Sequence, residues 1–208
     1  MNTRHNPWDD DYLRRGRLWG GSAGSLPRLP HSSRILELGC GNGKTVSALV
    51  GGGCCVTAVD FSPHAAFLCR HTCADPDQAR ILIADIRKTP FRNNSFDAVI
   101  ASHITGHLSV DGRRHMASEV LRLLAPGGTL YFRDFSTGDF RYGRGKETEP
   151  GTFLRKNGIA THYFTDDELP TLFAGLAVRL LIQHRWAMRV RGTVLPRAEI
   201  VAEFKKSG

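Results

Sequence analysis

Glu37-Leu38-Gly39-Cys40-Gly41-Asn42-Gly43 is the stretch of this chain that decides its fold. It follows a short apolar run at residues 34–38, which predicts a buried strand, and it precedes residues 44–50, which predict a helix. Glycine has no Cβ, so the three glycines let the backbone turn sharply and approach a ligand closely. A strand, a glycine-rich turn and a helix in succession predict an α/β fold that binds a ligand at the turn.

Two features of this turn narrow the choice of ligand. Alternating glycines are a weak signal by themselves, because nicotinamide-binding folds carry similar turns. Here, however, Lys44 occupies the position of the last glycine in the dinucleotide fingerprint. Glu37 also lies inside the predicted strand, where a carboxylate is costly unless it meets a polar ligand. The turn therefore favours a cofactor other than a dinucleotide.

The segments after the turn alternate between strands and helices. Strands are expected at residues 55–59, 80–84, 96–102 and 129–133, with helices starting at Lys44 and Ser62 and a third over 112–124. This alternation predicts a parallel sheet with crossover helices on both faces. Asp60 and Asp85 follow the second and third strands, at the sheet edge where ligands of open α/β sheets bind.

The C-terminal part has a different pattern. Residues 178–191 and 197–205 alternate with the two-residue period of half-buried strands. Residues 192–196 are expected to join them as the turn of an antiparallel hairpin at one sheet edge. The complete prediction is a Rossmann-like, doubly wound α/β fold, with a seven-stranded sheet that is mostly parallel and has a reversed C-terminal strand.

The composition is that of an ordinary globular protein. The 208 residues are 41% hydrophobic and 23% charged, and a single domain over residues 1–208 is expected. No apolar run reaches the roughly 20 residues of a membrane span, and the polar N-terminus does not resemble an export signal. We therefore expect a cytoplasmic protein with no membrane association. The five cysteines are expected to be reduced, and no metal site is expected, because Cys69 and Cys73 have no second pair.

The net charge of +8 is distributed unevenly. Residues 35–112 are close to neutral, whereas residues 1–34 and 113–208 carry the basic surplus. A basic surface favours a polyanionic partner such as RNA, through phosphate contacts and counterion release. On charge alone, a solvated basic face that aids solubility is an equally good interpretation.

With the glycine turn, Glu37 and the strand-end aspartates in this order, the sequence resembles the class I S-adenosylmethionine (SAM)-dependent methyltransferases. The resemblance implies that Glu37 and the turn hold the amino-acid part of SAM, through Gly39, Cys40, Gly41, Asn42 and Gly43. It implies that Asp60 binds the ribose hydroxyls and that Asp85 accepts the adenine amino group. Neighbouring residues would complete the site, namely Phe61, Ser62, Ile86 and Ser102. The alternative for both aspartates is a helix or turn cap.

The flanking segments resemble one branch of these enzymes in more detail. The segments are Trp8-Asp9-Asp10-Asp11-Tyr12, Phe132-Arg133-Asp134-Phe135, residues 158–169 and Leu195-Pro196-Arg197. Similar motifs occur in the same order in the eukaryotic methyltransferase-like enzymes that make 3-methylcytidine in transfer RNA. Trp8 and Tyr12 are further candidates for the cofactor site, because residues 1–33 could fold over it as a lid. Alternatively, they staple the N-terminal segment to the sheet.

Candidate catalytic residues follow the fourth and fifth predicted strands. Cytosine N3 needs no strong base, so the enzyme would instead stabilise the positive charge that develops on the base, and Asp134 is the carboxylate expected to do so. His103 and His107 could accept a proton from a more acidic acceptor. The alternatives are a salt bridge of Asp134 with Arg133 or Arg141, and histidines that serve only the structure.

Basic residues outside the cofactor half are the candidate contacts to RNA. Residues 139–164 are expected to form a basic loop on the acceptor side, and Arg185, Arg189 and Arg191 share one face of a tail strand. The alternative is an edge strand that its charges protect from aggregation. Three functions stay open: an N-methyltransferase acting on tRNA, a methyltransferase for an acidic small molecule, and a non-catalytic cofactor-binding subunit. We favour the first, and a partner protein is worth seeking because no separate RNA-binding module is recognised.

Overall fold

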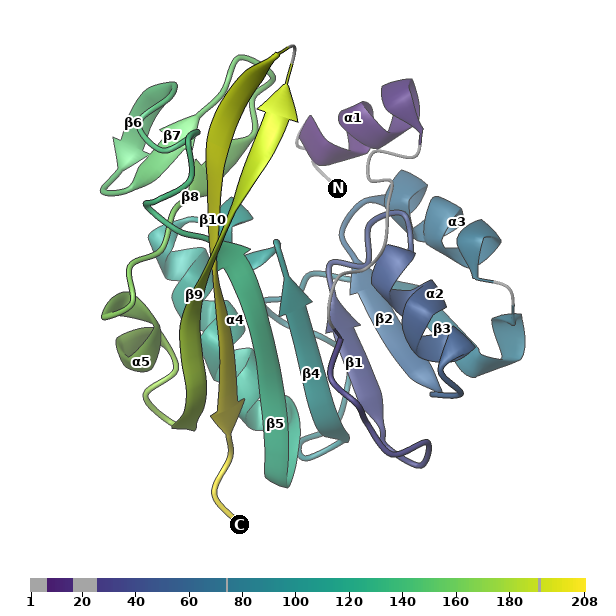
Figure 1. Cartoon of the computed structure of the whole chain (residues 1–208). Helices are drawn as coiled ribbons and strands as arrows, with labels where there is room; N and C mark the ends of the chain where they lie inside the picture. Colours follow the sequence, from purple (N-terminus) through teal and green to yellow (C-terminus); the bar gives the residue numbers. More distant parts are fainter. Residues whose placement is uncertain (1–6, 17–25, 74, 191) are drawn as a thin grey trace.

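The computed structural model describes residues 7–16, 26–73, 75–190 and 192–208. Its centre is a seven-stranded sheet in the order β3-β2-β1-β4-β5-β10-β9 (Figure 1). In that order the strands span Ala79–Ile83, Val56–Asp60, Ile35–Leu38, Phe96–Ser102, Leu124–Phe135, Thr193–Lys205 and Ala177–Val190. All neighbouring strands are parallel except for β10, which is antiparallel to both β5 and β9. The predicted fold, with its reversed C-terminal strand, is confirmed.

Helices cover both faces of this sheet (Figure 1). They are α2 (Lys44–Gly51) and α3 (Pro63–Thr72) on one face, with α4 (Val110–Leu123) and α5 (Glu168–Leu172) on the other. Under α2 and α3, Val46 and Cys69 pack with Ile35 of β1 in one buried cluster. Under α4 and α5, Met116 and Leu169 belong to a second buried cluster. The sheet therefore has an apolar layer on each face, which explains why its central strands are mostly apolar.

The fourth helix and the fifth strand differ from their predicted limits. α4 begins at Val110 because the Ser109 side chain accepts a hydrogen bond from the Gly112 N–H, at 3.2 Å, and so caps the helix. Our prediction that the fifth strand starts at residue 129 is wrong. β5 starts at Leu124, and the Pro126-Gly127-Gly128 segment pairs with the C-terminus: Lys206 N–H donates to the Gly128 carbonyl at 2.9 Å.

The C-terminal hairpin is longer than expected. β10 resumes at Thr193, so Leu195 and Pro196, which we expected in the turn, pair with Met188 and Ala187 of β9. β5 pairs with β10 only from Glu199 onward, and the tip of the hairpin therefore extends beyond the sheet (Figure 1). Four alternate residues of β10 face the core as predicted: Ala198, Ile200, Ala202 and Phe204. Arg191 lies outside the described residues.

Residues 139–164 are not the loop that we expected. They contain a separate three-stranded antiparallel sheet of β6 (Lys146–Glu149), β7 (Thr152–Leu154) and β8 (Ala160–His162), which we call the small sheet. Its strands have only three or four residues each. Runs this short do not display a two-residue period, which is why the pattern predicted a loop.

The N-terminal helix α1 (Pro7–Arg15) packs against α3 near the carboxyl ends of β1 and β2 (Figure 1). It covers only part of the lid segment predicted at residues 1–33, because residues 1–6 and 17–25 lie outside the described part of the chain. None of the helices described here is both long enough and apolar enough to cross a membrane.

Candidate functional site

The glycine turn joins β1 to α2, and its conformation explains its composition. Gly39 and Gly41 have φ angles of +73° and +53°, in the left-handed region that favours glycine. A Cβ on Gly39 would lie 2.6 Å from the Ile104 side chain, and one on Gly41 would lie 2.6 Å from the Tyr12 hydroxyl. Both glycines are therefore required by space as well as by backbone angle.

Glu37 lies below this turn and is 3% exposed. Its Oε2 atom is buried and has no hydrogen-bond partner among the described residues. Burial raises the pKa of Glu37 well above its ordinary value, and the nearby Cys69 and Asp60 add to this, although a hydrogen bond from the Thr45 hydroxyl opposes it. A buried carboxylate oxygen without a partner is costly, so the geometry fits a polar or cationic ligand at this position.

Asp60 ends β2 and faces the same turn. Its Oδ2 accepts a hydrogen bond from Gly41 N–H at 2.8 Å, and its Oδ1 accepts one from Ser62 N–H at 2.9 Å. Burial raises the pKa of Asp60 despite these bonds, which lower it. Each carboxylate oxygen has a second lone pair. Asp60 can therefore tie the glycine turn to the start of α3 and still accept hydrogen bonds from a ligand.

Asp85 follows β3 and already has a partner. The Arg87 guanidinium donates to both of its oxygens, the shortest distance being 2.6 Å from Nη2 to Oδ2. This pairing lowers the pKa of Asp85, although burial opposes it. Ile86 is 5% exposed and packs in the core, whereas the ring of Phe61 is 60% exposed. Of the predicted adenine contacts, then, Asp85 is engaged by an arginine and Ile86 faces inward.

Helix α1 brings further residues to the turn. The Asp9 carboxylate accepts hydrogen bonds from the Ser62 hydroxyl and from the His64 N–H, and its other oxygen lies 2.9 Å from His64 Nδ1. These contacts hold α1 on the N-terminus of α3. In this position Tyr12 covers Gly41, and the ring of Trp8 packs 6.3 Å from that of Tyr12.

A second group of polar side chains lies where β4 and β5 end, beside the middle of β10. His103 follows β4, and its Nε2 is 3.3 Å from Oε2 of Glu199, while its Nδ1 is 3.9 Å from Oδ1 of Asp134. The His103 ring stacks on Phe135, with 4.3 Å between centroids. Asp134 is 1% exposed and accepts hydrogen bonds from Gly106 N–H and Phe135 N–H, at 2.8 and 2.9 Å. We call His103, Asp134 and Glu199 the edge cluster.

The arginines proposed as partners of Asp134 have other contacts. Arg141 binds Asp139, with 2.6 Å between Nε and Oδ1, and Arg133 Nη1 lies 3.7 Å from Glu199. Asp134 instead uses both oxygens for backbone N–H groups, so it fixes the turn after β4 against β5.

The two candidate histidines differ in their surroundings. Burial lowers the pKa of His107, whose Nδ1 lies 2.9 Å from the Ala160 carbonyl and must carry a proton to donate to it. Burial also opposes protonation of His103, but Asp134 and Glu199 outweigh it and raise the pKa of His103. His107 is therefore held neutral, whereas His103 is held toward its protonated form.

The sequence and the fold of this chain both resemble those of known methyltransferases. A sequence family described as "Methyltransferase domain" matches residues 35–128, from β1 into β5. Over these residues the chain is therefore similar to a methyltransferase domain. Among solved structures, a SAM-dependent methyltransferase of Methanosarcina mazei superposes with a TM-score of 0.72 at 23% identity, and the match covers 86% of this chain and 94% of that one. At this identity the likeness shows that the two chains share a fold.

Curated relatives of this chain include a tRNA methyltransferase and an O-methyltransferase by name. The chain is 29% identical over 204 residues to the tRNA N(3)-cytidine methyltransferase METTL2 of Bos taurus, and this match covers 88% of the chain and 53% of that protein. It is 28% identical over 161 residues to O-methyltransferase 3 of Dictyostelium discoideum, over 71% of this chain and 37% of that protein. The chain spans about half, or less, of the length of these relatives.

Most of the residues predicted to bind the cofactor lie together. The glycine turn is surrounded by Glu37, Asp60, Ser62 and Tyr12. Within the turn, Asn42 is 2% exposed and the Cys40 thiol is hydrogen-bonded to the Cys69 thiol. Ser102 lies further along, beside Arg133 in the β4–β5 pairing.

Two residues of the candidate site were missed by sequence reasoning. Asp9 was quoted only as part of a motif, and Glu199 only as a polar position of a strand; both act on residues far away in the chain. The one available signal was Asp9 itself, because a carboxylate favours a helix N-terminus.

The lowered pKa of His107 predicts how stability depends on pH. A histidine whose pKa is lower in the folded than in the unfolded state contributes stability above its unfolded value of about 6.5, and this contribution is lost as the pH falls through the folded value. We expect the wild type to lose stability between pH 7.5 and 5 relative to His107→Gln, measured by urea denaturation. His115→Gln, in solvent on α4, is the control. Parallel curves for the wild type and His107→Gln would contradict the assignment.

Proposed function

We propose that this chain transfers a methyl group from SAM to a ring nitrogen of a base in transfer RNA, with the N3 atom of cytidine as the expected acceptor. The observation that carries the donor half is the buried Oε2 of Glu37, which has no hydrogen-bond partner among the described residues and lies beneath a turn where a Cβ on Gly39 or Gly41 would clash. The similarity to tRNA N(3)-cytidine methyltransferases over most of this chain supports the acceptor half. A cytoplasmic location is part of the same proposal.

The proposed cofactor contacts follow from the placement of the carboxylates. Glu37 and the glycine turn would hold the amino-acid part of SAM, and Asp60 would accept the ribose hydroxyls through its remaining lone pairs. Asp85 would reach the adenine amino group while still bound to Arg87, with Phe61 over the ring. Trp8 and Tyr12 would close the site from α1, held by Asp9.

The chemistry asks little of the chain beyond positioning. When bound, SAM supplies an electrophilic methyl group. The lone pair of cytosine N3 needs no base, so the residues at the ends of β4 and β5 have to orient the acceptor and stabilise the charge that it gains. Asp134 supplies a fixed negative charge close to the ends of β4 and β5, because its two backbone hydrogen bonds prevent its side chain from rotating. Unstacking the base costs a few kcal/mol, which contacts to RNA must offset.

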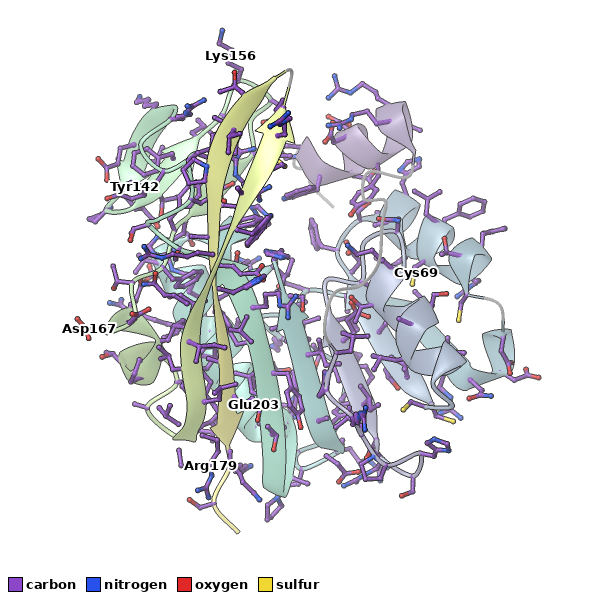
Figure 2. All side chains as sticks on the ribbon, in the orientation of Figure 1. Cys69, Tyr142, Lys156, Asp167, Arg179 and Glu203 are labelled. Carbon is purple, nitrogen blue, oxygen red and sulfur yellow. The ribbon has the colours of Figure 1, made fainter. Side chains whose placement is uncertain are left out.

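Basic residues of the hairpin tip and the small sheet would make those contacts. Arg185 and Arg189 are exposed on β9, in the half of the hairpin that extends beyond the sheet. Lys156, beside the small sheet, lies at the same end of the molecule (Figure 2). The proposal includes a partner protein that presents the RNA. Mass spectrometry of the proteins that copurify with the tagged chain from its own cells tests this.

Removing two of these charges gives a prediction for RNA binding. Affinity for fluorescent tRNA is expected to fall steeply with added salt, and Arg185→Ser with Arg189→Ser should reduce the slope of log Kd against log salt by about 1 to 2. The control is Arg80→Ser with Arg114→Ser, which removes the same charge from exposed positions of β3 and α4. Equal losses in both double variants would show that only net charge matters, and the proposed surface would be wrong.

The decisive experiment is a methyl-transfer assay with a labelled donor. Purified protein is incubated with trideuteromethyl SAM and total tRNA, and the digested nucleosides are analysed by mass spectrometry. The expected product is deuterated 3-methylcytidine, which Asp60→Ala should not form. A deuterated methyl group on another nucleoside would correct the acceptor atom, and none on any nucleoside would refute the RNA proposal.

A small-molecule acceptor is the second candidate. The similarity to O-methyltransferase 3 favours it, because a hydroxyl acceptor must lose a proton and a histidine lies at the end of β4. Label in the metabolite fraction of the same assay, with none in RNA, would support it. Binding of SAM without transfer to either fraction would support the non-catalytic subunit instead.

A further inference from the structure

Glu199 is a buried carboxylate that the proposed chemistry does not yet use. It is 4% exposed and lies on β10, the reversed strand, directly opposite Phe135 of β5. Its Oε2 is 3.3 Å from His103 Nε2, and its Oε1 is 3.0 Å from His184 Nδ1 on β9. Glu199 therefore joins a side chain that follows β4 to one on β9.

His103 has a left-handed backbone conformation. Its φ angle is +54°, a region that non-glycine residues occupy at a cost and mostly where the surroundings enforce it. The His103 N–H donates to the Arg133 carbonyl at 2.7 Å, and the ring is fixed on Phe135. The chain thus holds this imidazole in one place at the expense of backbone strain.

The ring of His103 lies between two carboxylates. Nε2 faces Glu199, and Nδ1 is enclosed near Asp134, with no hydrogen-bond partner in the part of the chain that the structure describes. A neutral imidazole carries only one N–H, so in either tautomer a bare nitrogen lone pair would face a negative oxygen. The doubly protonated ring directs one N–H toward each carboxylate, and this removes the conflict.

We propose that Glu199 is a positioning residue that, together with Asp134, holds His103 as an imidazolium at the methyl-transfer edge. Burial of the ring opposes this state, and the two carboxylates outweigh the burial, which is why the pKa of His103 is raised. The pKa of Glu199 is in turn lowered: burial raises it, but His103, His184 and Arg133 together lower it by more than burial raises it. Other ionisable groups also surround His103 or its partner Phe135, namely His107, Arg141 and Arg197.

This charge state selects among acceptors, and that consequence rests on the proposed function. An imidazolium whose two N–H groups face carboxylates cannot take up a proton, so it suits an acceptor that loses none. For cytosine, the N3 lone pair forms the new bond to carbon, and the bonding pair of the broken S–CH₃ bond stays on sulfur. The positive charge passes from sulfur to the base, and no proton moves. Two carboxylates and one imidazolium leave the edge cluster with a net negative charge that favours this product.

The charge state is measured directly by NMR titration of the free protein. The Cε1–H signal of His103, assigned by its loss in His103→Gln, is followed against pH in protein without cofactor or RNA. We expect a pKa above the ordinary value of about 6.5 in the wild type, and a lower one in both Glu199→Gln and Asp134→Asn. The double variant should titrate below 6.5, because burial then acts alone. Glu199→Asp should recover part of the shift.

The matched control is Glu203→Gln, on the same face of β10 but far from the hairpin tip (Figure 2). It should leave the His103 titration unchanged. A wild-type value at or below 6.5, or an unchanged value in a folded Glu199→Gln, would overturn the proposal. Because neither SAM nor RNA is present, a raised pKa together with failed methyl transfer would refute the proposed function alone.

Discussion

Glu37→Gln is expected to raise the melting temperature of the ligand-free protein and to weaken SAM binding by about 10- to 150-fold. The two effects have one cause. The carboxylate is buried, its Oε2 has no hydrogen-bond partner within the described ranges, and burial raises its pKa well above the ordinary value. A neutral amide of the same shape removes the cost of the buried charge. It also removes a charge-assisted hydrogen bond to the ligand, which contributes about 1.5–3 kcal/mol.

Glu119→Gln separates this effect from a general response to losing a buried glutamate. Glu119 is 8% exposed, but Arg122 and Thr89 bind its oxygens at 2.7–2.8 Å, and they lower its pKa although burial opposes this. That variant should melt at a lower temperature and bind SAM normally. Differential scanning calorimetry and isothermal titration calorimetry give both quantities. If Glu37→Gln melts lower and binds SAM as the wild type does, Glu37 is a structural residue and the assignment fails.

The cofactor half of the site is predictable because its signals are local. Glu37 lies next to the end of a strand, the glycine turn follows that strand, and Asp60 ends the next one; an open parallel sheet brings such positions to one edge whatever the rest of the chain does. Periodicity was enough to find β9 and β10 and the reversed strand. The errors came where long-range contacts set the limits, as for the Pro126-Gly127-Gly128 segment, which pairs with Lys206.

The edge cluster was only half predictable. His103 and Asp134 follow predicted strands, so their placement at the sheet edge could be inferred. Glu199 reaches them through the register of β10 against β5, which pairs it with Phe135. A shift of one residue would point Glu199 to the other face, and no local pattern fixes that register. The charge of His103 depends on this tertiary pairing and was therefore beyond sequence reasoning, which treated His103 as a proton acceptor.

Asp139→Ala is expected to lower the free energy of unfolding by about 3–5 kcal/mol, the usual cost of removing one partner from a buried ion pair. The Asp139 side chain is fully buried and receives Nε of Arg141 and Nε of Arg197, each at 2.6 Å. These bonds tie the segment that leads to the small sheet to β10. Alanine would leave two guanidinium groups in a low-dielectric setting without their carboxylate. For a chain of this length the melting temperature should fall by roughly 6–20 °C.

The pH dependence of the same variant gives an independent check. Burial opposes ionisation of Asp139, but the two arginines outweigh it and lower its pKa. The stabilising contribution is therefore complete above the unfolded value of about 3.9 and is lost as the pH falls through the folded one. Urea denaturation should show the wild type and the variant converging in acid. Asp111→Ala, whose partner Arg114 is exposed, should cost at most about 1 kcal/mol. A comparable loss in both variants would mean that Asp139 does not hold the small sheet to β10.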